Sequence, residues 1–217
     1  MHQFLKQEKE IRRWFEGHSG IYNYTLQRDN KYGYRINTSE VVDLSNQNLE
    51  FIPVKFGSIQ SDFLCINNYL TSLEFAPTQV QAFICDNNCL ETLIGCPQII
   101  FSSFSCEKNN LTSLQGGPPE VERYFCGFNR LTTLKGIAKR IGSRFDAQFN
   151  DLSSLDYLPQ EVNTRVELNL QNNPKLGQIQ RITNFYDLQE YLDIERDQEK
   201  LEKMLINQNL SHKINKV

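Results

Sequence analysis

Cysteine and histidine are the side chains of this chain best suited to hold a metal ion or act as nucleophile and base. A structural zinc site gathers four such ligands, and a cysteine nucleophile needs a base beside it. The chain has six cysteines, four of which recur at intervals of 20 or 21 residues, at Cys65, Cys85, Cys106 and Cys126. The three histidines lie far from these cysteines and from one another, at His2, His18 and His212. This spacing does not favour a shared metal or catalytic site.

The regular interval instead predicts a packing role for the four cysteines, because free cysteine behaves as a small apolar side chain when buried. The glycine and proline run at residues 116–119 lacks the Lys-Ser/Thr of a phosphate-binding loop. We therefore expect no enzyme activity, no catalytic residues, no metal and no cofactor. Cys89 and Cys96 fall outside the interval and are predicted to be accessible thiols without an assigned role.

An asparagine column shares the cysteine interval and identifies the element that repeats. Each member follows a small or apolar residue by three positions and precedes a leucine by two or three. The column comprises Gln47, Asn68, Asn88, Asn109, Asn129, Asn150 and Asn173. A motif of this kind at a period of 20 to 23 residues is typical of a leucine-rich-repeat solenoid.

One repeat predicts one strand followed by a turn. Phe63 and Cys65 alternate with Leu64 and Ile66, which is the period of a strand with one face buried. The asparagine then stands where the chain leaves the strand, and its amide can bond neighbouring main-chain groups. We predict a mostly β fold of the α/β repeat type, with about seven coils of 20 to 23 residues and parallel strands. Each coil is stable only against its neighbours.

The repeat divides the chain into three parts. Residues 1–38 are predicted to form a helix and a β-hairpin that cap the first coil, because apolar residues recur first at helical and then at strand spacing. Residues 39–176 form the solenoid. Residues 177–217 form an acidic amphipathic helical cap and a polar tail. This last helix could be a cap with a solvated face or a surface for a partner or a second copy.

Composition narrows the classes of partner. The formal net charge is −3, with 26 acidic and 23 basic residues, so nucleic acid is not a favoured ligand. No apolar run approaches the roughly 18 residues of a membrane-spanning helix, and the charged start of the chain lacks the apolar core of a signal peptide. We expect a cytoplasmic protein without a membrane partner.

The strand positions that alternate with the buried columns form the surface best suited to binding. Several are apolar, two are arginines, and Phe128 and Phe149 occupy a turn column that elsewhere carries asparagine or lysine. Apolar side chains beside arginines are typical of a protein-binding patch. Coverage by the N-terminal hairpin, or a simple strand preference, is the alternative. The predicted concave patch comprises Leu64, Ile66, Ile84, Ser105, Glu107, Arg123, Phe125, Phe128, Arg144 and Asp146.

The repeat F-x-C-x-x-N-x-L-T-S-L-x-G-x-P-x-x-V resembles the short, cysteine-containing leucine-rich repeats of bacterial type. The run over residues 21–77 is similar to proteins encoded by bacteriophages and prophages, through the motifs at residues 43–49, 56–59 and 62–68. The resemblance implies protein binding. Bacterial effectors with similar repeats can carry a ubiquitin-ligase domain, but the residues after 176 are too few for one and contain no cysteine.

Together these observations predict a non-enzymatic, phage-encoded binding protein in the host cytoplasm. It would engage a host or phage protein through the concave strand face, with inhibition or counter-defence as the expected consequence. A structural protein that oligomerises through its caps is the alternative from a different class, and a nucleic-acid binder is the third.

Overall fold

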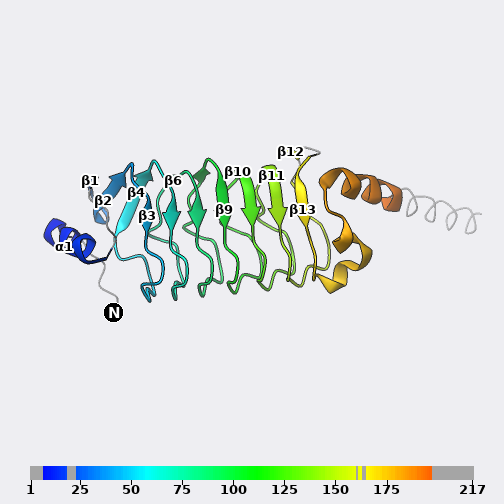
Figure 1. Cartoon of the computed structure of the whole chain (residues 1–217), viewed down its shortest axis with the longest axis horizontal. Helices are drawn as coiled ribbons and strands as arrows, with labels where there is room; N and C mark the ends of the chain where they lie inside the picture. Colours follow the sequence, from blue (N-terminus) through cyan, green and yellow to red (C-terminus); the bar gives the residue numbers. More distant parts are fainter. Residues whose placement is uncertain (1–6, 19–22, 160, 163–164, 197–217) are drawn as a thin grey trace, which may run out of the picture.

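The computed structural model describes residues 7–18, 23–159, 161–162 and 165–196. Within them the chain winds into a parallel β solenoid of about six turns, with few helices (Figure 1). One sheet, here called the long sheet, runs the length of the stack and takes a strand from each coil, with two strands from the last one. Its strands are β3 (Val42–Asp43), β5 (Phe63–Leu64), β7 (Phe83–Ile84), β9 (Ser103–Ser105), β10 (Glu120–Phe125), β11 (Arg140–Asp146), β12 (Glu161–Val162) and β13 (Glu167–Asn169).

The expected number of coils was one too high. The asparagine column has seven positions, but seven positions enclose six intervals, and the stack has about six turns. After Asn173 the chain does not complete another circuit and enters the 3-10 helix η1 (Pro174–Arg181). Pro174 fixes its own backbone angle and favours the start of a helix.

The predicted asparagine ladder is confirmed. The side-chain amide of Asn88 donates to the carbonyls of Cys65 and Cys85 at 2.9 and 3.1 Å and to that of Asp86 at 3.2 Å. Its oxygen accepts the N–H of Leu70 at 3.0 Å. Each such side chain therefore bonds the main chain of its own coil and of the preceding one. The same arrangement recurs at Asn68, Asn109, Asn129, Asn150 and Asn173.

The two inward columns form the core, as the alternation predicts. Five aromatic rings follow one another along the axis with centroids 4.9 to 6.3 Å apart, the first two pairs stacked and the last two edge to face, at Phe63, Phe83, Phe104, Tyr124 and Phe145. All five are fully buried, as are the four cysteines of the adjacent column. The packing role expected for these cysteines is confirmed.

A second sheet lies next to the long sheet, because only two or three residues separate most of its strands from the long-sheet strands that follow. It comprises β1 (Tyr24–Asp29), β2 (Gly33–Thr38), β4 (Lys55–Ile59), β6 (Gln79–Val80) and β8 (Ile99–Ile100). β1 and β2 form the predicted antiparallel hairpin, and β2 then pairs in parallel with β4. The strands β6 and β8 were not predicted, because only their single buried valine or isoleucine repeats clearly in the sequence.

Helical segments lie at both ends of the stack (Figure 1). Helix α1 (Glu8–His18) buries Ile11 and Phe15, and the Phe15 ring lies 6.1 Å from that of Phe56. At the other end, residues 185–196 are helical and bury Phe185 and Leu188. The later apolar positions and the polar tail predicted over residues 197–217 lie outside the described residues. No described helix is both long enough and apolar enough to cross a membrane.

Candidate functional site

The outer face of the long sheet carries the predicted patch, but two of its ten members are not accessible. Ser105 and Asp146 are only 5% and 3% exposed, so the prediction that they line an open surface is wrong. Ser105 donates its hydroxyl to Asp86 at 2.6 Å. Asp146 accepts from the Asn169 amide at 2.9 Å. Each of these side chains therefore forms a hydrogen bond to an adjacent coil.

The other eight predicted residues are at least partly accessible. Arg123, Phe128 and Arg144 are exposed. The half-buried members are Leu64, Ile66, Ile84, Glu107 and Phe125. The exposed members lie on β10, on the turn that follows it and on the neighbouring strand β11.

Arg144 is held on this face by three neighbours. Its guanidinium lies 3.6 Å from a carboxylate oxygen of Asp146 and 3.6 Å from one of Glu167. It also lies over the Phe125 ring, 5.6 Å from the centroid. A cation over an aromatic face is attracted by the ring and orients it. Phe125 is therefore a positioned aromatic surface beside a largely neutralised arginine.

The residue before each ladder position has left-handed backbone geometry. The φ angles in this column lie between 52° and 59°, at Asn46, Asn67, Asn87, Lys108, Phe128, Phe149 and Asn172. Asparagine tolerates this region better than other side chains with a Cβ. The first three also bond side chain to side chain, at 3.0 Å from Asn67 to Asn46 and 2.7 Å from Asn87 to Asn67.

Phe128 and Phe149 occupy the same strained geometry. A left-handed conformation costs a residue of this kind about 1 to 2 kcal/mol. The two rings stack with centroids 4.4 Å apart and an interplanar angle of 15°, and they remain 38% and 44% exposed. The Lys108 ammonium lies 5.7 Å from the Phe128 centroid. Phe149 was not among the ten predicted patch residues, although its place in the same column as Phe128 was a sufficient signal.

Two partly buried carboxylates lie beside this aromatic surface. Burial raises the pKa of Asp86 above its ordinary value, although hydrogen bonds from Ser105 and from the Glu107 N–H lower it. Burial also raises the pKa of Glu107, and the nearby charges of Asp86 and Asp146 add to this effect. The face therefore has an acidic strip next to its arginines.

The buried thiols are unsuited to nucleophilic chemistry. Burial raises the pKa of Cys85, Cys106 and Cys126 well above the ordinary value, and a thiol must ionise to act as a nucleophile. Cys96 was expected to be accessible, but it is 4% exposed and its pKa is raised by burial. Cys89 is partly exposed.

Metal ligation finds no support in the described part of the chain. No group of three or more histidine, cysteine or acidic side chains that could hold a metal ion occurs among the described residues. His18 is the last residue of α1, and His2 and His212 lie outside the described residues.

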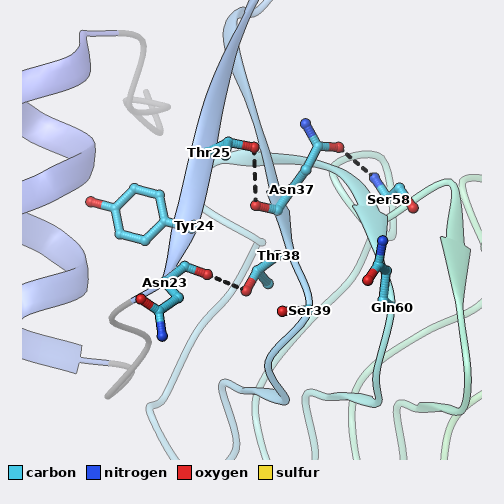
Figure 2. Close-up of a pocket in the computed structure, with 8 residues that line it drawn as sticks. All are labelled: Asn23, Tyr24, Thr25, Asn37, Thr38, Ser39, Ser58 and Gln60. Atoms are coloured by element: carbon cyan, nitrogen blue, oxygen red, sulfur yellow. Dashed lines mark hydrogen bonds between the residues drawn. The ribbon is translucent and has the colours of Figure 1, made fainter.

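A polar hollow of about 540 Å³ lies where the hairpin meets β4 (Figure 2). Its polar groups bond one another: the Thr38 hydroxyl donates to the Asn23 carbonyl at 2.5 Å, and the Ser58 N–H donates to the Asn37 side chain at 2.8 Å. Figure 2 shows the Tyr24 ring directed toward α1 and away from these groups. No charged side chain lines the hollow. It is less suited to chemistry than the outer face of the long sheet.

No protein-family model, curated protein or solved structure matches this chain. The function is therefore inferred from the residues of the outer face.

Proposed function

We propose that this chain is a leucine-rich-repeat protein that acts as a non-enzymatic, protein-binding module through the outer, concave face of its long sheet. The observation that carries the proposal is the exposed Phe128–Phe149 stack. Ring stacking is worth about 0.5 to 1.5 kcal/mol, which is less than the backbone strain of about 2 to 4 kcal/mol for the two residues together. Strained positions of this kind cluster at functional sites, and a binding role accounts for aromatic residues there.

The surroundings of the stack support a protein partner. Aromatic residues and arginine are enriched where proteins bind one another. Phe125 and Arg144 lie on the same face and order each other. Partly exposed aliphatic side chains extend the face toward the first coils, at Leu64, Ile66 and Ile84.

The helical ends fit the role of caps. A solenoid needs polar-faced terminal units over its last coils. Helix α1 buries its apolar side and keeps Arg12 and Arg13 exposed, and residues 185–196 do the same with Glu190 and Asp193 exposed. These segments cover the ends and leave the outer face for a partner. The resemblance of the repeats to phage and prophage proteins makes a host or phage protein in the host cytoplasm the expected partner, and inhibition the expected consequence.

Affinity capture from bacterial lysate tests the proposal. The test variant combines Phe128→Asn and Phe149→Asn, because asparagine occupies the same backbone geometry in earlier coils and should preserve the fold. The control combines Ile99→Asn and Phe101→Asn, which are 49% and 58% exposed and lie outside the long sheet. We expect the test variant to lose the captured partner and the control to keep it. Equal recovery of the captured partner by both variants would show that the outer face is not the binding surface.

Assembly through the C-terminal helix is a second candidate function. Tyr186 and Ile194 are 60% and 54% exposed on this helix, and a hollow of about 450 Å³ lies between it and the turn at residues 155–159. Light scattering of the full chain with Tyr186→Glu and Ile194→Glu separates the candidates. A cap-mediated oligomer should dissociate, whereas a monomer of unchanged mass in wild type and variant contradicts assembly.

A further inference from the structure

Two arginines lie side by side on the outer face. Arg123 of β10 and Arg144 of β11 are register partners in a parallel pair. Neighbouring strands of a sheet are about 4.8 Å apart, so the two side chains leave the sheet as near neighbours. Both are exposed.

The two guanidinium groups have different surroundings. Arg144 has Asp146 and Glu167 as ion-pair partners. Within the described part of the chain, the acceptor for Arg123 is the Ser102 hydroxyl, at 3.4 Å. The adjacent Glu122 directs its carboxylate over Gly142 instead. Arginine has five N–H donors, so Arg123 keeps most of its donors available for an external acceptor.

The groups around Arg123 restrict what that acceptor can belong to. Phe125 lies two residues along the same strand, and the Phe128–Phe149 stack lies beyond it. Glu107 and Glu167 flank this area, and the chain has a net charge of −3. A polyanion such as nucleic acid would place further negative charges near these carboxylates and be repelled by them. A single carboxylate flanked by apolar side chains would contact Arg123 without approaching Glu107 or Glu167.

We propose that the partner presents a protein segment with a carboxylate seated on Arg123, beside Arg144, and an apolar side chain packed on Phe125 and the Phe128–Phe149 stack. This inference rests on the proposed function and specifies the partner that the face recognises. Arginine and carboxylate groups can pair through two parallel hydrogen bonds, which gives geometric selectivity as well as attraction. The acidic strip at Asp86 and Glu107 fixes the orientation, because it repels a segment docked with its carboxylate on that side.

Selection from a displayed library of random dodecapeptides tests this inference without a known partner. The full-length wild type should enrich peptides in which aspartate or glutamate stands close to an aliphatic or aromatic residue. Synthetic copies of these peptides should bind Arg123→Glu about tenfold or more weakly, and Arg123→Lys should retain part of the affinity. Selection on Arg123→Glu should enrich lysine or arginine in place of the acidic residue.

The outcomes separate this inference from the proposed function. Peptides that bind the wild type and lose affinity with Phe128→Asn/Phe149→Asn, but that lack an acidic residue or ignore Arg123→Glu, would overturn the carboxylate site and leave the binding face. Selected peptides that neither substitution affects would overturn both. A wild-type pool without acidic enrichment also counts against the carboxylate site. Tighter binding of a single-stranded oligonucleotide than of any selected peptide would replace it with a nucleic-acid site.

Discussion

Tyr124 brings a hydroxyl group into the aromatic core. Its neighbours in the same column, Phe104 and Phe145, have no polar atom there. The Tyr124 side chain is fully buried, and its hydroxyl finds no hydrogen-bond partner among the described residues. A buried hydroxyl without a partner has lost its bonds to water and gained nothing in return.

Tyr124→Phe should therefore stabilise the protein by about 1 kcal/mol. The substitution removes the uncompensated hydroxyl and keeps the ring that packs on Phe104 and Phe145. Urea unfolding of both proteins measures the difference in the free energy of unfolding. A loss of more than about 1 kcal/mol would instead indicate that the hydroxyl has a partner, such as buried water.

Asp86 should make stability depend on pH in a defined direction. Its pKa is raised in the folded state, mainly by burial, so the folded protein binds a proton there more readily than the unfolded chain. Stability should therefore fall as the pH rises through this raised pKa. At neutral pH Asp86→Asn removes the cost of the buried charge, and its amide oxygen can still accept from Ser105 and the Glu107 N–H.

We expect Asp86→Asn to be more stable than the wild type at neutral pH. The advantage should shrink as the pH approaches the unfolded value of about 4. Urea unfolding at a series of pH values measures this difference. A difference that grows toward acid pH would show that the charge on Asp86 stabilises the fold.

At the scale of the element, the asparagine ladder joins one coil to the next. Asn88 makes four hydrogen bonds, three as donor and one as acceptor, and three of the four are fully buried. Asn88→Ala leaves main-chain groups unsatisfied, each at a cost of about 1 to 3 kcal/mol. We expect a loss of about 3 kcal/mol or more in thermal or urea unfolding. The matched control Asn110→Ala, at a half-buried position, should cost about 0.5 kcal/mol or less. Equal costs would mean that the ladder is not what links the coils.

The elements that depend on residue type at a fixed interval were predictable. The phenylalanine, cysteine and asparagine columns each require one kind of side chain once per coil, so the core and the ladder could be identified from the sequence. The hairpin followed from strand alternation around Asp29 and Asn30. The strands β6 and β8 were missed, because each has only one buried position that repeats clearly in the sequence and so shows no alternation.

The candidate site was predictable only in part, because its details depend on side chains from adjacent coils. Asp146 is buried by Arg144 beside it and by Asn169, which stands 23 residues later in the sequence. The alternation of buried and exposed strand positions assigns Asp146 to the open face, but it cannot show that side chains from the same and the next coil bury this residue. The left-handed backbone at Phe128 was likewise visible only indirectly, since asparagine fills that position in other coils.

At the scale of the whole molecule, the solenoid should unfold as one unit. Trp14 is the single tryptophan and packs on the core from α1, while Leu152 is buried near the other end. Strong coupling between coils predicts that a destabilising substitution at one end also lowers the stability measured at the other end. Leu152→Ala should cost about 2 to 5 kcal/mol and lower the unfolding midpoint reported by Trp14 fluorescence. A midpoint unchanged at Trp14, with a second transition in circular dichroism, would indicate that the coils unfold separately.

The outer face of the long sheet is the surface proposed to bind the partner, and photo-crosslinking tests this proposal most directly. A photoreactive phenylalanine placed at Phe149 lies on the outer face, and one placed at Phe101 lies outside the long sheet with similar exposure. Irradiation in bacterial cells should give a discrete crosslinked protein from position 149 and none from position 101. Crosslinks to the same protein from both positions, or from position 101 alone, would contradict the account.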